Sequence, residues 1–179
     1  MRRSGTLRSS LVTRLSSLVT RHSSLLNDCI FCKILAGEIP SVRVHEGPNA
    51  VAFLDVNPMA KGHVLVVPRR HWADLASVPV AEAGDVAAFS ELMHTVRAIA
   101  KAAIRAGWDG ANVLQCTGES AGQTVGHLHF HVIPRRAGGP VPPAFDSGAG
   151  RYESDAERDA VAAKLREAIA AVFAEEQLY

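Results

Sequence analysis

The chain has 179 residues, 47% of them apolar and 21% charged, and carries a formal net charge of +1 at pH 7. This length fits one domain with or without a tail, and the apolar fraction excludes a wholly disordered chain. The sequence contains no run of about 18 uncharged apolar residues, and its charge is close to zero. We therefore expect neither a membrane nor a specific nucleic acid as a partner.

The N-terminal segment, residues 1–27, differs from the rest of the chain. It contains five arginines and no acidic residue, whereas residues 28–179 contain 14 basic and 18 acidic residues. Such a segment, rich in Arg and Ser, is typical of an organelle transit peptide; the alternative is a low-complexity disordered extension or an upstream start codon that is not used. We expect a cytoplasmic protein, or one of a mitochondrial-type organelle if residues 1–27 act as a targeting segment.

The residues after Asp28 predict strands joined by tight turns. Three short runs rich in Val, Phe and Leu follow one another and indicate a meander of antiparallel strands. Two further runs of this kind lie beyond the middle of the chain. The five predicted strands occupy residues 42–45, 50–56, 63–67, 112–116 and 127–134.

A long helix is predicted between the third and the fourth strand. It covers residues 80–106, and Gly107 stands where a helix stop belongs. Apolar residues recur in it at spacings of three and four, namely Val86, Phe89, Met93, Val96, Ala100 and Ala103.

The C-terminal region predicts a linker rich in Pro and Gly and then a last helix over residues 155–174. Ser154 can cap this helix, with Glu157 as the return half of a capping box. The apolar stripe of the helix packs on the domain or on a partner subunit, and the sequence leaves both open. The stripe consists of Val161, Leu165, Ile169 and Val172.

Five strands and separate helices that do not alternate with them indicate the fold class α+β, with a five-stranded antiparallel sheet. The chain then divides into four parts. They are a basic tail (1–27), the main domain (28–139), a Pro/Gly linker (140–152) and a C-terminal helix (153–179).

Three of the eight histidines, His127, His129 and His131, lie within five residues. On a strand, alternate residues point to one face about 7 Å apart, so these imidazoles can flank a substrate together while the apolar residues between them face a core. Histidine acts as a nucleophile and proton donor near neutral pH, and it is also a common metal ligand. A glycine-rich loop over residues 118–126 leads into this run and offers donors to an anionic group such as phosphate. Together the two features indicate a phosphate-handling site.

The sequence GQTV at residues 122–125, followed by the three histidines, resembles the signature of the histidine-triad (HIT) family. Further matches in the same order are CIFCKI at 29–34, GEIP at 37–40, AFLD at 52–55 and KGHVLVVP at 61–68, with His71 close behind. The resemblance covers about residues 29–136 and is strongest to the Hint-like bacterial branch. It implies a catalytic domain with one long helix and a short N-terminal helix beside the sheet.

The resemblance implies an enzyme that hydrolyses or transfers nucleotidyl groups through a nucleotidyl-histidine intermediate. His129 would attack the α-phosphorus, with its other ring nitrogen held by a backbone carbonyl. His131 would hydrogen-bond the phosphate and the leaving group, and His63 would support the site from a neighbouring strand. Phosphate oxygens would be held by Gly122, Gln123 and Thr124. No organic cofactor and no catalytic metal are implied.

The resemblance also implies a nucleoside site. Asp55 would bind the ribose hydroxyls, and an apolar pocket around the base would consist of Phe31, Phe53, Leu54 and Val56. For all four the alternative is strand core, and alternation along the strand turns one of Phe53 and Leu54 inward in any case. One position departs from the pattern: Cys116 stands two residues before Gly118, where relatives usually offer an amide to the phosphate.

Cys29 and Cys32 form a C-x-x-C pair, which by itself is compatible with redox or metal-binding roles. No βαβ pattern surrounds it, which argues against a thioredoxin-like motif. The resemblance to bacterial relatives implies a structural zinc ion on Cys29, Cys32, His71 and His127. The alternative is a pair of free thiols in a reducing cytosol.

The expected function is hydrolysis of purine nucleoside phosphoramidates or related nucleotides at the α-phosphate. Two alternatives remain open, namely a dinucleoside-polyphosphate hydrolase and a nucleotide-binding regulatory protein with little turnover. By resemblance the expected partners are a purine nucleotide substrate and a second copy of the chain, joined through the long helix and its neighbouring strand.

Overall fold

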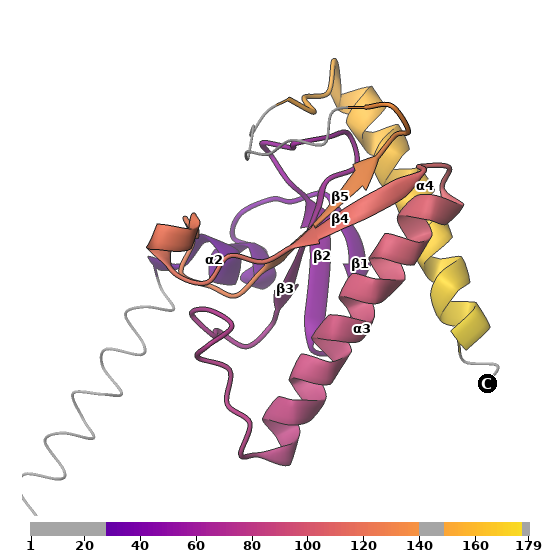
Figure 1. Ribbon diagram of the computed structural model, residues 1–179. Helices are drawn as coiled ribbons and strands as arrows, with labels where there is room; N and C mark the ends of the chain where they lie inside the picture. Colours follow the sequence, from indigo (N-terminus) through magenta and orange to yellow (C-terminus); the bar gives the residue numbers. More distant parts are fainter. Residues whose placement is uncertain (1–27, 140–148, 177–179) are drawn as a thin grey trace, which may run out of the picture.

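The predicted strands form one antiparallel sheet in the computed structural model, which describes residues 28–139 and 149–176 (Figure 1). Its order is β1-β2-β3-β5-β4, so β3 and β5, which are far apart in the chain, are neighbours. The strands are β1 (Arg43–Glu46), β2 (Ala50–Leu54), β3 (Val64–Pro68), β4 (Gly110–Leu114) and β5 (Phe130–Arg135). The fold is α+β, as predicted, whereas residues 1–27, and with them the predicted targeting segment, lie outside the described residues.

The central strands β2 and β3 are buried on both faces, because helices pack against each face of this part of the sheet. Leu54 and its neighbours on one face belong to a core with α3 (Ala83–Arg105) and α4 (Asp155–Glu176). Phe53 and its neighbours on the other face belong to a smaller core with the short helix α2 (Ile30–Ala36). Alternation along β2 and β3 therefore sends successive side chains into two different cores, which explains why these strands are apolar at every position.

The long predicted helix is α3, and Gly107 follows it with φ +90°, a left-handed conformation that suits a glycine helix stop. The predicted apolar stripe is wrong in part. Val86 and Met93 lie at the surface, 49% and 36% exposed, while Leu92 and Ile99 fill the core. The helix is apolar on two adjoining faces, and periodicity alone does not say which of them meets the sheet.

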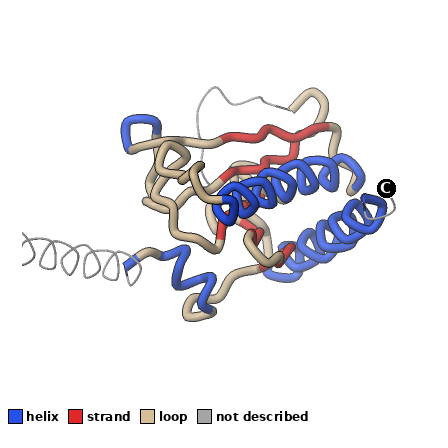
Figure 2. Tube along the Cα trace, turned by 90° about the horizontal axis from the view of Figure 1, so that it is seen from below, coloured by secondary structure: helices blue, strands red, loops and turns tan. Residues whose placement is uncertain are grey.

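Helix α4 packs on the domain, which decides the question that the sequence left open. It lies beside α3 (Figure 2), and its buried residues include Leu165, Ile169 and Val172 of the predicted stripe. The capping box forms with one change. Ser154 Oγ accepts from the Glu157 N–H at 3.2 Å, but the Glu157 carboxylate accepts from Glu153 N at 2.8 Å. No helix among the described residues is long and apolar enough to cross a membrane.

Candidate active site

Of the three clustered histidines, only His131 lies within β5 (Phe130–Arg135). The predicted strand begins at residue 127, but β5 begins at Phe130, so His127 and His129 lie in the segment before the strand. That segment is fixed by the Leu128 N–H, which donates to the Trp72 carbonyl at 2.6 Å. The expected alternation still holds, because Leu128 and Phe130 enter the α3 core. The rings of His127 and His129 meet Phe31 of α2 on the other face, with centroids 5.9 and 5.2 Å apart.

His129 is buried and has one ring nitrogen committed. Its Nδ1 lies 2.7 Å from the His127 carbonyl oxygen, so Nδ1 carries the hydrogen and Nε2 keeps a lone pair. Burial lowers the pKa of His129 below its ordinary value, and the hydrogen bond to the carbonyl opposes this only in part. The residue is therefore a neutral imidazole with a fixed tautomer near pH 7, which is the form that a nitrogen nucleophile needs.

His63 and His131 form a hydrogen-bonded pair across β3 and β5. His63 Nε2 and His131 Nδ1 are 2.9 Å apart, and the Met59 N–H donates to His63 Nδ1 at 3.2 Å. With Nδ1 accepting, His63 Nε2 carries the hydrogen and donates to His131, which leaves the hydrogen of His131 on Nε2. Burial lowers the pKa of both imidazoles to about 4. The rings of His131 and His129 lie 5.1 Å apart, so this N–H and the free nitrogen of His129 belong to one site.

Asp55 lies beside His63. Its Oδ2 is 3.4 Å from His63 Nδ1, and its Oδ1 accepts from the Asn57 N–H at 2.9 Å. The carboxylate raises the pKa of His63, although burial has the larger effect and lowers it. The structure thus joins Asp55 to the histidines, while its expected contact with ribose stays a prediction.

The four residues expected around the base are divided by the sheet. Phe31 and Phe53 pack edge to face on the side of α2, with ring centroids 5.8 Å apart. Leu54 lies on the opposite face, in the core with α3, so its expected place around the base is wrong and it has the strand-core role that alternation allows. Val56 is 87% exposed in the loop after β2. Phe31 is the one of the four whose ring meets the histidines, and Phe53 packs behind it.

The loop before the histidines is held together by Gln123. Its amide nitrogen donates to the carbonyls of Ala73 and Val125 at 2.6 and 2.9 Å, and its Oε1 accepts from the Gly118 N–H at 2.8 Å. Both amide hydrogens are used, so the structure gives Gln123 a role in shaping the loop, while its expected contact with phosphate stays a prediction. The backbone N–H of Gly122 is also used, by Glu119 O at 2.9 Å.

Two other residues near this loop differ in their exposure. Thr124 is exposed on the loop. Cys116, which replaces the amide of the family pattern, is buried and 7% exposed. The expected contact of Thr124 with phosphate stays a prediction.

Cys29, Cys32, His71 and His127 form a second cluster next to the histidine site. Their ligand atoms all lie within 4.8 Å of one another. His127 Nδ1 is 3.5 Å from Cys29 Sγ and 3.6 Å from Cys32 Sγ, and His71 Nδ1 is 3.3 Å from Cys32 Sγ. Tetrahedral zinc with bonds of about 2.3 Å to sulfur and 2.0–2.1 Å to nitrogen separates these ligands by about 3.5 Å. The residues present therefore fit a closed Cys₂His₂ zinc site.

The second nitrogen of His127 supports the same fit. Its Nε2 lies 2.9 Å from the Pro68 carbonyl oxygen and donates to it, which turns the lone pair of Nδ1 toward the two sulfurs. The Pro68 carbonyl thus orients His127, as the His127 carbonyl orients His129. Such partners leave no trace in the pattern of side chains, and the sequence analysis therefore missed Pro68 and Met59.

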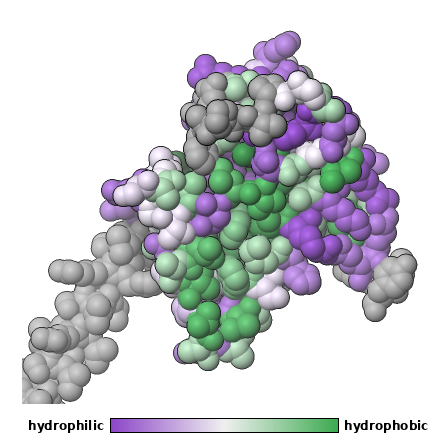
Figure 3. Space-filling view, viewed as in Figure 1, coloured by the Kyte–Doolittle hydropathy of each residue, from purple (hydrophilic) through white to green (hydrophobic). Residues whose placement is uncertain are grey.

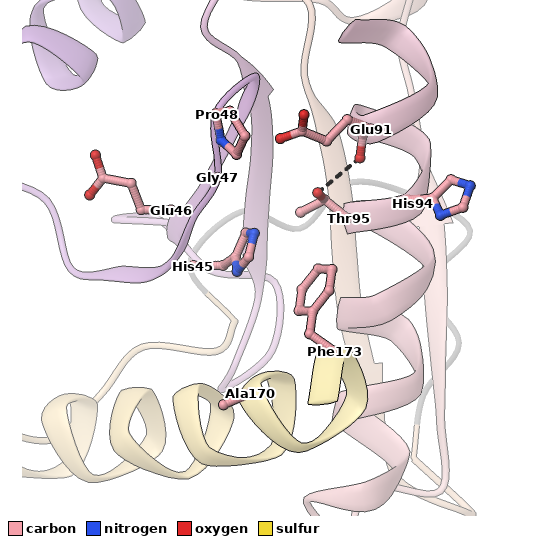
Figure 4. Close-up of a pocket in the computed structure, with 9 residues that line it drawn as sticks. All are labelled: His45, Glu46, Gly47, Pro48, Glu91, His94, Thr95, Ala170 and Phe173. Atoms are coloured by element: carbon pink, nitrogen blue, oxygen red, sulfur yellow. Dashed lines mark hydrogen bonds between the residues drawn. The ribbon is translucent and has the colours of Figure 1, made fainter. Parts of the chain in front are cut away.

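A separate hollow of about 430 Å³ lies between the β1–β2 turn, α3 and α4 (Figure 4). His45 from β1 stacks there on Phe173 of α4, with ring centroids 4.6 Å apart. Glu91 accepts hydrogen bonds from the backbone and the side chain of Asn49 at 2.9 and 2.7 Å. None of the residues predicted for catalysis, nucleotide or metal binding lines this hollow, so we do not assign it to the site.

Comparison with known proteins gives the class to which this fold and site belong. A HIT domain model matches residues 36–138, and the chain belongs to the HIT family. It is 42% identical to a HIT-like protein of Methanocaldococcus jannaschii over 110 residues. The matched stretch covers 62% of this chain and 81% of the relative. It is 40% identical to an adenosine 5'-monophosphoramidase of Candida albicans over 108 residues. That stretch covers 60% of this chain and 70% of the relative.

A solved structure extends the likeness beyond the family domain. The crystal structure of a Zn-bound histidine triad family protein from Mycobacterium smegmatis superposes with a TM-score of 0.69 at 32% identity. The match covers 84% of this chain and 99% of that one. A match of this extent reaches past residue 138, the end of the HIT domain.

Proposed function

We propose that the protein is a nucleotide hydrolase that acts on the α-phosphate of purine nucleoside phosphoramidates or related nucleotides. The observation that carries the proposal is the state of His129. Its Nδ1–H is fixed on the His127 carbonyl, its Nε2 lone pair is free, and burial keeps the ring neutral. The Candida albicans relative is an adenosine 5'-monophosphoramidase, which supports the same class of substrate.

In the proposed reaction His129 Nε2 attacks the α-phosphorus and the bond from phosphorus to the leaving amine breaks. His131, whose Nε2 carries its hydrogen, hydrogen-bonds the phosphate and the departing group. Water then attacks the nucleotidyl group on His129, so that the complete cycle consumes one water and yields a nucleoside monophosphate and an amine. Thr124 and the loop backbone would hold phosphate oxygens.

The nucleoside would lie beside α2 and β2. Phe31 and Phe53 offer an apolar surface for a base next to His129, and Asp55 would accept from ribose hydroxyls. We also propose that Cys29, Cys32, His71 and His127 hold a structural zinc ion. The distances among their ligand atoms support this, as does the Zn-bound relative from Mycobacterium smegmatis. This ion would join α2 to the segment that carries His129.

The test compares hydrolysis of adenosine phosphoramidate and of diadenosine polyphosphates by the wild type and by His129→Ala. We expect turnover of the phosphoramidate, and a loss of at least about 10³-fold in kcat in the variant, because the attacking group is removed. The matched control is His94→Ala, which removes an exposed imidazole of α3 and leaves the rate unchanged.

Other results point to the alternatives. Preferred turnover of the polyphosphates would favour a dinucleoside-polyphosphate hydrolase. Binding of adenosine monophosphate without turnover of any substrate would favour a regulatory protein, in line with the missing amide at Cys116. Undiminished turnover by His129→Ala would remove the nucleophile from the proposal.

A further inference from the structure

The segment just before α4 packs on the loop that carries His63. This segment, residues 149–153, is called the strap below. The sequence analysis assigned residues 149–152 to the linker, but Gly150 is buried and its N–H donates to the Pro58 carbonyl at 2.8 Å. The end of the predicted linker is therefore a packed element of the domain.

Gly150 is in close contact with the loop backbone. A Cβ added at this position would lie 2.3 Å from the Ala60 carbonyl carbon and 2.4 Å from its Cα. Real Cβ atoms do not approach backbone so closely, and the atoms in the way cannot turn aside as a flexible side chain would. Only glycine fits here without displacing the loop.

Tyr152 and two carboxylates hold the rest of the loop. The Gly62 N–H donates to Tyr152 Oη at 2.9 Å, and the half-buried tyrosine ring packs against the core under α3. Lys61 Nζ lies 3.8 Å from Glu153 and is ion-paired with Glu157 in the first turn of α4. Contacts from residues 150–157 thus follow the loop from Pro58 to Gly62.

The same loop sets the state of His63. The Met59 N–H donates to His63 Nδ1 at 3.2 Å, and the His63 N–H donates to the Ala60 carbonyl at 3.0 Å. Met59 and Ala60 lie between the two points, Pro58 and Gly62, that the strap holds. The Met59 N–H at Nδ1 favours the tautomer with the hydrogen on His63 Nε2, which donates to His131 Nδ1 at 2.9 Å, whereas the Asp55 carboxylate, 3.4 Å from Nδ1, favours the other tautomer. The position of the Met59 N–H therefore decides which tautomer prevails.

We infer that Gly150 and Tyr152 are positioning residues for the histidine site. They hold the 58–62 loop so that His63 keeps one tautomer and directs the N–H of His131 toward the substrate. The inference rests on the proposed function for the meaning of His131, but the tautomers themselves are independent of any substrate. The HIT domain covers residues 36–138. The inference therefore gives residues that follow this domain a role in positioning the histidines.

The test uses Tyr152→Phe, which removes one hydroxyl, and Gly150→Ala, which adds one methyl group against the loop. Imidazole ¹⁵N chemical shifts of the wild type and the variants report the tautomers of His63 and His131. Steady-state kinetics on adenosine phosphoramidate are measured in parallel. The matched control is Arg166→Ala, because Arg166 ties α4 to the Arg43 carbonyl at 2.8 Å and does not touch the loop.

We expect mixed tautomers of His63 and His131 in both strap variants and an unchanged pattern in the control. In the strap variants kcat falls, by several-fold to about tenfold for the lost hydroxyl and by more for Gly150→Ala, with KM little changed. Wild-type shifts and wild-type kcat in both strap variants would overturn the inference. Equal changes in Arg166→Ala would also overturn it, since they would show only a loosened α4.

The two proposals fail in different ways. If the wild type turns over no nucleotide but the strap variants shift the imidazole signals, the proposed function fails and the positioning role stands. If the wild type is active and the strap variants match it in both measurements, only the positioning role fails. Thermal unfolding of each variant identifies any that does not fold, and Tyr152→Phe is then the decisive one, because it adds no volume.

Discussion

The neighbouring histidines have the same side chain but differ in which ring nitrogen is free, because one nitrogen of each ring has a different hydrogen-bond partner. His129 donates from Nδ1 to the His127 carbonyl, whereas His127 donates from Nε2 to the Pro68 carbonyl. His131 instead accepts at Nδ1 from His63. The free nitrogen is therefore Nε2 in His129 and Nδ1 in His127, and one can face a substrate while the other faces two sulfurs.

The buried His63–His131 pair makes the fold sensitive to mild acid. Both residues have a pKa of about 4 in the folded chain because of burial, against about 6.5 when unfolded. Between these values the unfolded chain binds more protons, so the free energy of unfolding rises with pH. We expect each of the two groups to lower the free energy of unfolding by about 2 kcal/mol on going from pH 7 to pH 5, measured by urea unfolding.

Substitution isolates this effect. His131→Gln removes one titrating group and reduces the slope of stability against pH. Carboxylates with a lowered pKa, such as Glu46 and Glu157, lose their stabilising charge only below about pH 4.5 and so lie outside this window. A stability that is flat from pH 7 to pH 5 would contradict the burial of the pair.

At the scale of elements, the short helix α2 depends on contacts from outside itself. It has seven residues, fewer than an isolated helix needs, and its N-cap Cys29 makes no side-chain capping bond. Arg43 of β1 donates to the Ile34 carbonyl at the C-terminal end, at 2.7 Å. At the other end the Cys/His cluster joins α2 to the segment before β5, so we expect the metal to hold Phe31 against the histidines.

Removal of the metal is therefore expected to loosen α2. Cys32→Ser lowers the zinc content from about one equivalent to a small fraction of it and lowers the free energy of unfolding by roughly 2–5 kcal/mol. Metal analysis and denaturant unfolding check both expectations. Cys116→Ser is the matched control, since this buried cysteine lies outside the cluster and its loss leaves the zinc in place. A wild type without zinc would contradict the site.

At the scale of the whole molecule, one apolar surface is left open. Apolar side chains gather over α3 and β4 in Figure 3, and β4 is an edge strand with one neighbour. The exposed apolar side chains there are Val86, Met93, Ile104 and Val113. We propose that a second copy of the chain covers this surface, because an exposed apolar patch beside an open strand edge is typical of a subunit interface.

A single charge placed in this surface tests the dimer. Met93→Glu is expected to convert a dimer into a monomer, as measured by light scattering after size-exclusion chromatography, because the carboxylate would be buried without a partner. Ala163→Glu adds the same charge at an exposed position of α4 and is expected to leave the dimer intact. A monomeric wild type at micromolar concentration would refute the proposal.

Much of this molecule follows from local sequence. Alternating and continuous apolar runs gave the strands to within a few residues, and periodicity gave both long helices, because hydrophobic period depends on backbone geometry alone. The C-x-x-C pair and the clustered histidines indicated the two groups of side chains that the structure brings together. The sequence did not predict correctly which side of its strand or helix each residue occupies. Leu54 lies in the core with α3, and Val86 and Met93 lie at the surface.

The sequence by itself determined the fold class and which residue types carry the chemistry. Only the tertiary structure decided how they are used. It placed Cys29 and Cys32 against His127, set His63 beside His131, and engaged the Gln123 amide with the backbone around its own loop. It also packed Gly150 on the loop before β3. These outcomes depend on contacts between distant segments and on backbone groups, which every residue possesses and no sequence pattern distinguishes.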